Sequence, residues 1–410
     1  MRPTPERPCR VVILGAGFAG LELATRLSEG LAENVRITLI DKNDSFVFGF
    51  SKLDVMFGSA ALEDVRYPYS MIVNPVIDFR QETVLSIDPS HKLVVTNAGS
   101  YEADVLVIAL GADTVPAATP GLVRFGDEFY SPEGAARIAG RLEHFRSGVA
   151  VIGVLGPFFK CPPAPNEAAL MLHQYLTDRG IRDAVTIHLV SPLSSPIPIS
   201  EETSAAIVSM LTDRGIHYWP DTRISRVDGT SRMLHMDDGR TLGYDLLLGI
   251  PVHQAPAVVG AAGLTDDGWI PVDPATFATR FDHVYAVGDI TNAPVPRAGS
   301  IAEGEAATLA DVLIAELTGA PVPPPYAGDA ICYIETGRQG VARVDVNFLS
   351  QAVPTARFQA PSASFSREKR GSAAFRARRW FGAPRRPSQP EAPQVRHASV
   401  APRPAGAPSE

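Results

Sequence analysis

A glycine-rich loop near the N-terminus constrains the fold of this chain most strongly. The apolar run 11–14 leads directly into Gly15-x-Gly17-x-x-Gly20, and a helical pattern covers about 18–29. Glycines at this spacing permit a tight turn and let the backbone approach a pyrophosphate held at the N-terminus of the helix. The loop therefore predicts the first strand–helix unit of a dinucleotide-binding domain.

An acidic residue after the next strand strengthens this prediction. Residues 35–40 form an apolar run that ends at Asp41, about 20 residues beyond the glycines, where a carboxylate can hydrogen-bond ribose hydroxyls. The run 104–112 has the composition of a buried parallel strand. A strand-like run at 283–290 and a helical pattern at 301–317 are expected to belong to the same dinucleotide-binding domain as the glycine-rich loop. The pattern indicates an α/β fold with parallel strands.

The rest of the chain predicts a second nucleotide-binding unit and a different C-terminal end. Strand-like and helical runs alternate again over about 148–260, and proline, alanine, serine and arginine dominate from about 354. Between them, residues 330–348 have the pattern of two strands around a turn at 336–340. We expect two Rossmann-like domains, divided as follows: a dinucleotide-binding domain of residues 10–115 and 265–325, a second, degenerate nucleotide-binding domain of residues 116–264 that interrupts it, a small C-terminal region of residues 326–382, and a disordered tail of residues 383–410.

The loop of the second unit departs from the nucleotide-binding pattern. It keeps Gly153-x-x-Gly156, but it continues to Cys161 and then to three prolines, each of which lacks the backbone N–H that a phosphate cradle uses. The next strand ends at Ser191, where NAD sites carry an acid and NADP sites have an arginine nearby. The loop indicates a nucleotide site converted to thiol chemistry.

The position of Cys161 favours a reactive thiol over an inert buried one. It lies beside Lys160 and just before a helix N-terminus, and both features favour the thiolate. Cys332 lies in a strand-like run, where burial as a small apolar residue explains it equally well. Cys9 precedes the first strand, and we expect a structural role for it.

Composition and charge limit the location and partners of the protein. No apolar run approaches the roughly 20 residues that span a bilayer, and residues 1–8 lack the apolar stretch of a secretory signal, which favours the cytoplasm. The three cysteines fit no zinc pattern and the nine histidines are scattered, so we expect no metal. The acidic core argues against nucleic acid.

A basic C-terminal end contrasts with an acidic body. Residues 361–410 hold 10 Lys/Arg and 3 Asp/Glu, a charge of +7, whereas residues 1–360 hold 27 basic and 42 acidic residues, a charge of −15. Residues 367–381 combine cations with aromatic side chains, a composition that suits the inner face of an anionic membrane. The alternatives are a solvated tail or a helix packed on the acidic body, and Gly371 weakens a helix.

Taken in order, these motifs resemble those of the two-domain flavoproteins of the pyridine nucleotide-disulfide oxidoreductase superfamily. The resemblance rests on the glycine loop with Asp41, on Leu110-Gly111-Ala112 and on Val287-Gly288-Asp289. It implies FAD as the cofactor, with a helix that begins near Ser300 directed at the flavin. The implied FAD-binding residues are Gly15, Gly17, Gly20, Asp41, Gly111, Ala112, Gly288, Asp289 and Ser300.

Two cysteine motifs are similar to one branch of that superfamily, the sulfide:quinone oxidoreductases and flavocytochrome c sulfide dehydrogenases. They are Lys160-Cys161-Pro162-Pro163-Ala164-Pro165-x-Glu167 and Cys332-Tyr333-Ile334-Glu335-x-Gly337. The resemblance implies a Cys161/Cys332 redox pair that oxidises sulfide or a related sulfur nucleophile. Many relatives carry a third cysteine near the flavin, and Cys9 is a poor candidate for it. The chain lacks a haem-attachment Cys-x-x-Cys-His, which favours a quinone as the acceptor.

Two other functions remain open on the sequence. The remnant glycines of the second loop are compatible with an NAD(P)H:quinone dehydrogenase, and a flavin-binding redox sensor without catalysis would carry the same flavin motifs. Lys160, His253 and Glu335 are candidates for proton transfer to the quinone or to sulfur, although a surface or hydrogen-bonding role explains each equally well.

Overall fold

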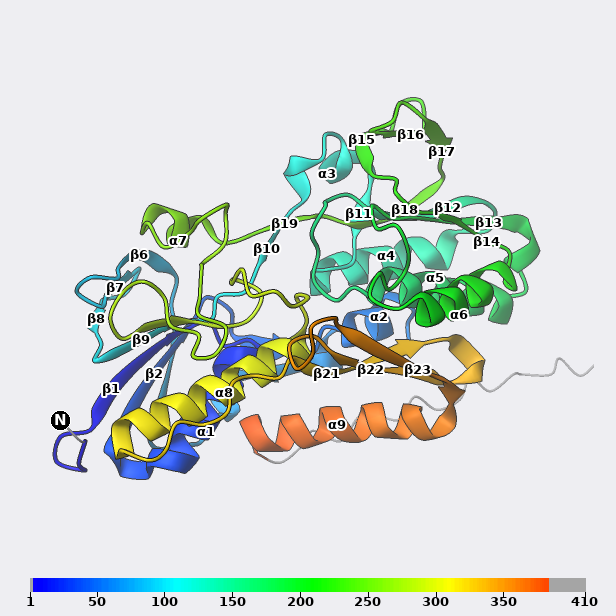
Figure 1. Ribbon diagram of the computed structural model, residues 1–410. Helices are drawn as coiled ribbons and strands as arrows, with labels where there is room; N and C mark the ends of the chain where they lie inside the picture. Colours follow the sequence, from blue (N-terminus) through cyan, green and yellow to red (C-terminus); the bar gives the residue numbers. More distant parts are fainter. Residues whose placement is uncertain (1–2, 383–410) are drawn as a thin grey trace, which may run out of the picture.

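The computed structural model describes residues 3–382 and forms two α/β halves joined by a C-terminal sheet and helix (Figure 1). The predicted disordered tail, residues 383–410, lies outside the described residues. The expected mixture of parallel sheets and helices is confirmed.

The first half is a five-stranded parallel sheet with the strand order β20-β9-β1-β2-β5. Its long helices, α1 (Phe18–Leu31) and α8 (Gly299–Thr318), pack against each other and against the sheet. The strands are β1 (Cys9–Leu14), β2 (Val35–Asp41), β5 (Ile77–Gln81), β9 (Val105–Ile108) and β20 (Val284–Ala286). The sequence predicted four of these strands and both helices.

The second half repeats this architecture with the strand order β11-β18-β12-β13-β14. Helices cover one face of its sheet, and a three-stranded antiparallel sheet packs on the other. The strands of the main sheet are β11 (Asp127–Glu128), β12 (Gly148–Val154), β13 (Val185–Val190), β14 (Ile216–Trp219) and β18 (Leu246–Ile250). The covering elements are α4 (Pro132–His144), α5 (Ala164–Asp178), α6 (Glu201–Thr212), β15 (Ile224–Asp228), β16 (Met233–Met236) and β17 (Thr241–Gly243).

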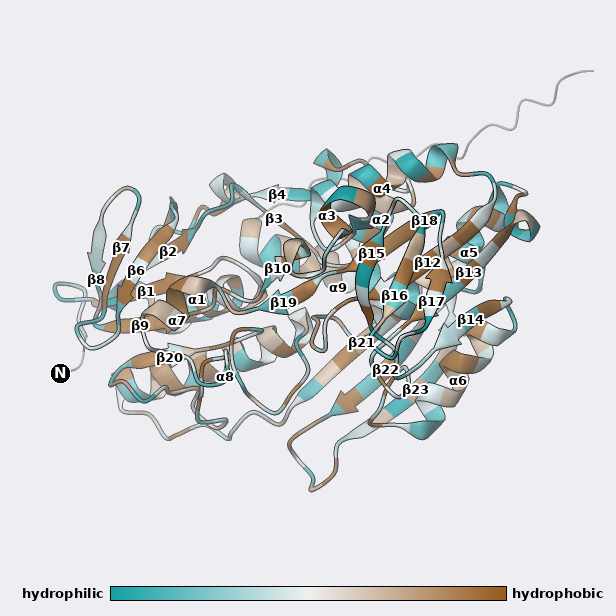
Figure 2. Cartoon of the chain, turned by 90° about the horizontal axis from the view of Figure 1, so that it is seen from above, coloured by the Kyte–Doolittle hydropathy of each residue, from teal (hydrophilic) through white to brown (hydrophobic). Residues whose placement is uncertain are grey.

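The inner strands of both sheets are apolar because they are buried on both faces. Figure 2 shows hydrophobic residues concentrated along these strands, and every residue of β9 and β18 is buried. Shorter elements complete the two halves: β3 (Ser45–Val47), α2 (Ser51–Met56), β4 (Arg66–Pro68), β6 (Val84–Asp88), β7 (Leu93–Thr96), β8 (Ser100–Glu102), β10 (Asp113–Val115), α3 (Leu122–Phe125), β19 (Val252–Gln254) and α7 (Ala257–Ala261).

The C-terminal region is more ordered than its composition indicated. Two strands around the turn at 336–340 were predicted, and they are β21 (Asp329–Glu335) and β22 (Val341–Asn347). The sequence did not predict β23 (Thr355–Ser362) or the full helix α9 (Ala363–Phe381). Figure 1 shows α9 running along this sheet toward α1.

Helix α9 forms despite the glycine at its centre. Gly371 costs about 1 kcal/mol of helix stability relative to alanine, but the side chain of Ser362 caps the helix by accepting a hydrogen bond from Phe365 N. Trp380 and Phe381 at the other end are 4% and 2% exposed and belong to the core of the first half. Burial of these two rings outweighs the glycine. Within residues 3–382, no helix has the length and apolar character needed to cross a membrane.

Candidate active site

One large cavity collects nearly all of the residues that the sequence singled out. It has a volume of about 640 Å³, which is within the range of roughly 300–1,000 Å³ for ligand sites. The predicted site residues that line it are Gly15, Gly17, Asp41, Gly111, Ala112, Cys161, Gly288, Asp289, Ser300 and Cys332. Gly20 does not line the cavity; it lies against the glycine loop.

The three glycines of the first loop act in different ways. A Cβ on Gly15 would lie 2.3 Å from Ala109 O, and the residue has a φ of +100°. A Cβ on Gly20 would lie 1.9 Å from Gly15 O, so this glycine lets α1 approach the loop. A Cβ on Gly17 would have no neighbour within 4 Å, because this residue borders the open cavity.

Three helices begin at the wall of the cavity. Their N-cap residues are Gly17 for α1, Pro163 for α5 and Ala298 for α8, and all three line the cavity. In the described chain, no side chain caps any of these helices. Uncapped N–H groups and the positive ends of helix dipoles attract anions. The ends of α1 and α8 therefore suit a pyrophosphate or another anionic group of a dinucleotide.

Asp41 at the end of β2 fixes the glycine loop. Its Oδ2 accepts a hydrogen bond from Ala16 N at 2.8 Å, and its Oδ1 accepts one from Asn43 N at 2.9 Å. The carboxylate still lines the cavity. Its predicted contact with ribose remains a prediction.

The Gly-Asp motif after β20 is supported by an acid that the sequence did not single out. Glu305 on α8 is 1% exposed, and its Oε2 accepts a hydrogen bond from Gly288 N at 2.5 Å. Burial raises the pKa of Glu305 to about 8. Burial also raises the pKa of Asp289, against the opposing charges of Lys160 and Arg297. The cavity size, the glycine loop and the two helix ends fit FAD.

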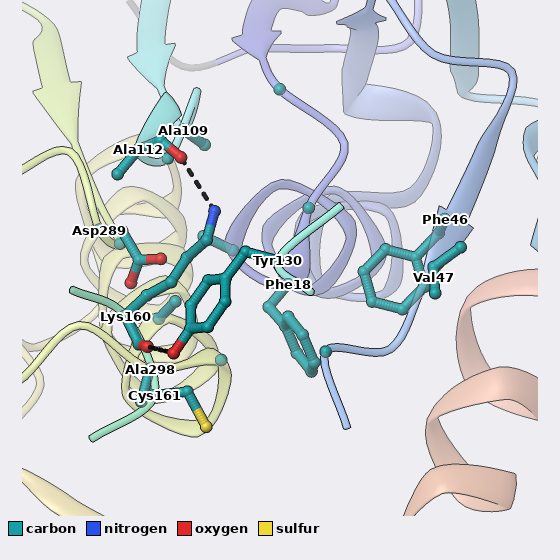
Figure 3. Close-up of a pocket in the computed structure, with 18 of the residues that line it drawn as sticks. Phe18, Phe46, Val47, Ala109, Ala112, Tyr130, Lys160, Cys161, Asp289 and Ala298 are labelled. Atoms are coloured by element: carbon teal, nitrogen blue, oxygen red, sulfur yellow. Dashed lines mark hydrogen bonds between the residues drawn. The ribbon is translucent and has the colours of Figure 1, made fainter. Parts of the chain in front are cut away.

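Cys161 lies in a strained turn that lines this cavity. Its φ is +60°, a left-handed conformation that is uncommon for a side chain with a Cβ. Its N–H donates to Arg297 O at 2.7 Å, and its carbonyl accepts from Ala164 N at 2.9 Å. Figure 3 shows its sulfur pointing away from the ammonium of Lys160. Cys332 reaches the same cavity from β21, and both cysteines are free thiols.

The prediction that the surroundings of Cys161 favour its thiolate is wrong. Burial raises the pKa of the Cys161 thiol, and the Glu167 carboxylate raises it further, against the opposing charges of Lys369 and Lys52. Burial also raises the pKa of Cys332, to about 12. The ammonium of Lys160, its neighbour in sequence, donates instead to Ala112 O at 2.9 Å.

Lys52 is a further cavity residue that the sequence did not reveal. Its Nζ donates to Tyr130 O at 2.6 Å, and burial lowers its pKa to about 8, with Lys160 as the second cause. The Tyr130 hydroxyl in turn donates to Lys160 O at 2.8 Å (Figure 3). No local pattern marks Lys52, because its role depends on contacts made by distant segments.

Two of the proton-transfer candidates, His253 and Glu335, are not among the residues that line the cavity. His253 is 5% exposed, and its Nδ1 is 2.8 Å from Pro251 O. Its Nε2 has no hydrogen-bond partner among the described residues, and burial lowers its pKa to about 3, so the ring is neutral. Glu335 accepts a hydrogen bond from Lys369 on α9 at 2.9 Å.

The segment for which membrane contact was expected is partly buried against the acidic body. Trp380 stacks with Phe48 and meets Phe46 edge-on, with ring centroids 6.2 and 5.6 Å apart. Arg376 pairs with Glu303 at 2.7 Å, and Arg379 pairs with Glu29 at 2.8 Å. The acidic body attracts this end of α9, which is a packed helix, while contact of its exposed side with a membrane remains a prediction.

Comparison with known proteins identifies the family. The pyridine nucleotide-disulphide oxidoreductase family matches residues 9–307. The chain is 23% identical over 340 residues to the mitochondrial sulfide:quinone oxidoreductase of Dictyostelium discoideum, covering 80% of this chain and 75% of that protein. It is 26% identical over 301 residues to the type II NADH:quinone oxidoreductase of Staphylococcus aureus, covering 68% of this chain and 74% of that one.

A solved structure agrees with this assignment at the level of the fold. The sulfide:quinone oxidoreductase from Aquifex aeolicus superimposes with a TM-score of 0.79 at 22% identity, covering 92% of this chain and 93% of that one. The predictions of FAD and of oxidoreductase activity are confirmed by the family match. The chain therefore belongs to the pyridine nucleotide-disulphide oxidoreductase family and is an FAD-dependent oxidoreductase.

Proposed function

We propose that the protein oxidises sulfide or a related small sulfur nucleophile through Cys161 and Cys332 and passes the electrons through FAD to a quinone. One observation carries the proposal. Cys161 lies in the loop before α5 and Cys332 lies in β21, far apart in sequence, yet both line the cavity that the glycine loop and the Gly-Asp motif also line. The relatives named for sulfide and for quinone support it.

The division of the chain into domains is part of the proposal. Residues 10–115 and 265–325 form the FAD-binding domain, residues 116–264 the degenerate nucleotide-binding domain, and residues 326–382 the region that brings Cys332 to the flavin site. The residues that would hold FAD are Gly15, Gly17, Gly20, Asp41, Gly111, Ala112, Gly288, Asp289 and Ser300.

The cysteine chemistry is an exchange at a disulfide. In the oxidised enzyme Cys161 and Cys332 are joined, and hydrosulfide attacks one of the two sulfurs. A new S–S bond forms to the incoming sulfur, which keeps its proton, while the old bond breaks and its electron pair leaves on the other cysteine as a thiolate. When bound, FAD supplies the two-electron chemistry that links this sulfur centre to the quinone.

A second candidate function is the oxidation of NADH by a quinone, which the Staphylococcus aureus relative favours. The second loop argues against it. A Cβ on Gly153 would lie 2.5 Å from the Ile224 side chain, so β15 covers the end of the strand. Glu167 occupies the first turn of α5 and is 3% exposed, where it would repel a pyrophosphate. Anaerobic reduction of the bound flavin by sulfide, compared with NADH, separates the two functions.

We also propose that the outward face of α9 contacts the inner surface of an anionic membrane, where a quinone is available. Arg367, Arg370, Phe375 and Arg378 are exposed and lie on one side of the helix, and Phe375 is 57% exposed. An apolar ring among cations suits a lipid headgroup region. Each cation near such a surface contributes on the order of 1 kcal/mol.

Charge reversal of this face is expected to release the protein from anionic vesicles. A variant with Arg367→Glu, Arg370→Glu and Arg378→Glu should bind at least about a hundredfold more weakly in a sedimentation assay, since about 3 kcal/mol of attraction is lost. A matched control reverses Arg226, Arg232 and Arg240 around β15–β17, far from α9 in Figure 1. Equal loss in both variants, or no loss in the first, would refute membrane contact by α9.

A further inference from the structure

Helix α9 carries a buried lysine into the wall of the cysteine cavity. Lys369 is 9% exposed and lines the cavity together with Cys161 and Cys332. Its Nζ lies 2.9 Å from Glu335 Oε1 and 3.6 Å from Glu167 Oε1. Glu167 Oε1 also accepts a hydrogen bond from Glu335 N at 3.1 Å. One ammonium thus bridges two carboxylates.

Each carboxylate lies close in sequence to one of the cysteines. Glu167 lies in the first turn of α5, which Cys161 precedes, and Glu335 ends β21, which contains Cys332. Lys369 therefore ties both cysteine-bearing segments of the chain to the C-terminal helix. This arrangement places a positive charge beside the thiols and keeps it there.

We infer that Lys369 is a positioning residue of the redox centre, whose ammonium stabilises the thiolate of Cys161 and holds Glu167 and Glu335 in place. The inference deepens the proposed function and rests on it, because it assigns the group that accommodates the negative charge when the Cys161–Cys332 bond breaks. It makes α9 an electrostatic part of the site as well as a surface element.

Two lysines lower the pKa of the Cys161 thiol, and they differ in whether they stay charged at alkaline pH. Glu167 and Cys332 raise the pKa of the Cys161 thiol, whereas Lys369 and Lys52 lower it. The pKa of Lys52 is itself lowered to about 8, so Lys52 loses its charge as the pH rises toward thiol ionisation. Lys369 behaves differently.

Lys369 keeps its charge at alkaline pH because acids surround it. Burial opposes the ammonium, but the carboxylates of Glu167, Glu335 and Asp54 outweigh this effect and raise its pKa. Tyr130 also interacts with Cys161, and a strongly raised pKa keeps its hydroxyl neutral. Of the two cations that lower the pKa of Cys161, Lys369 is therefore the one that persists when the thiolate forms.

Anchoring of α9 alone does not require this lysine. Arg376 pairs with Glu303, Arg379 pairs with Glu29, and the Trp380 and Phe381 rings are buried in the first half. A lysine buried between two acids costs desolvation energy that an apolar side chain would avoid. A role in the charge balance of the thiols explains its presence at this position.

The test is the pH dependence of thiol alkylation in the reduced, FAD-loaded protein. Iodoacetamide is the probe, and peptide mass mapping reports each cysteine separately. In Lys369→Met the midpoint for Cys161 should rise by about one pH unit, so that alkylation below the midpoint slows about tenfold. Lys369→Arg should restore the profile, and Arg370→Gln, at the exposed neighbour on α9, should leave it unchanged.

The direction of the change in Cys161 alkylation distinguishes loss of the Lys369 charge from loss of α9 packing. If α9 simply detached in Lys369→Met, Cys161 would become exposed and react faster at every pH, which would overturn the inference. An unchanged profile, or an equal shift in Lys369→Arg, would also overturn it. Glu335→Gln, which frees the Lys369 charge, should lower the Cys161 midpoint, and a rise would count against the inference. The assay uses neither sulfide nor quinone, so failure of the proposed function would be seen separately.

Discussion

Cys161→Ser is expected to retain FAD and to lose reduction of the flavin by sulfide, by on the order of a thousandfold or more. A serine oxygen cannot form a disulfide with Cys332 and cannot leave as a thiolate. The side chain makes no contact on which the fold depends, since the backbone N–H of residue 161 provides the bond to Arg297 O. Stopped-flow absorbance of the flavin under anaerobic conditions measures the effect.

Cys9→Ser is the matched control for this prediction. Cys9 is buried in β1 and does not line the cavity, so its replacement should leave the rate of sulfide-driven reduction unchanged. Cys332→Ser should behave like Cys161→Ser, because both sulfurs take part in the exchange. Wild-type rates in Cys161→Ser would remove the cysteine pair from the mechanism.

Gly20→Ala is expected to give a protein that loses its FAD and is less stable. The new Cβ would lie 1.9 Å from Gly15 O and 3.0 Å from Gly15 C, and neither backbone atom can move without displacing the loop from α1. Overpacking of this kind costs about 1–3 kcal/mol or more. Flavin absorbance per protein and the midpoint of urea denaturation report the two effects.

Variants at two other glycines distinguish overpacking of the loop from obstruction of the cavity. Gly99→Ala, on an exposed turn with no atom within 4 Å of the new Cβ, should change neither quantity. Gly17→Ala also meets no protein atom, but its Cβ would enter the cavity, so FAD retention should fall while the stability of the flavin-free protein stays the same. Full FAD content in Gly20→Ala would mean that the loop does not hold the cofactor as described.

The elements that the sequence predicted are those whose signals are local. The spacing of Gly15, Gly17 and Gly20 marks a turn by its backbone demands, and runs such as β9 are recognisable because buried parallel strands are apolar throughout. The turn between β21 and β22 was found from Gly337 and Gly340, which both have positive φ.

The features that the sequence did not predict depend on distant contacts. Helix α9 is rich in serine, alanine and arginine, so its sequence does not predict a buried side. Trp380 is buried because α9 packs against α1 and the hydrophobic core of the first half. Lys52, Glu305 and Lys369 gain their roles from segments far along the chain. The thiolate form of Cys161 was predicted from its neighbour Lys160 and from the helix that follows. The burial of the side chain decides its pKa, and this burial cannot be seen in the sequence.

The most direct measurement is anaerobic bleaching of the bound flavin by sulfide and, in a separate sample, by NADH. A sulfur-oxidising enzyme should be reduced rapidly by sulfide and hardly at all by NADH, because the second loop offers thiol chemistry in place of a pyrophosphate site. Reduction by NADH alone would contradict this account and return the cysteines to structural roles. Reduction by neither donor would also contradict it and would favour a flavin-binding sensor.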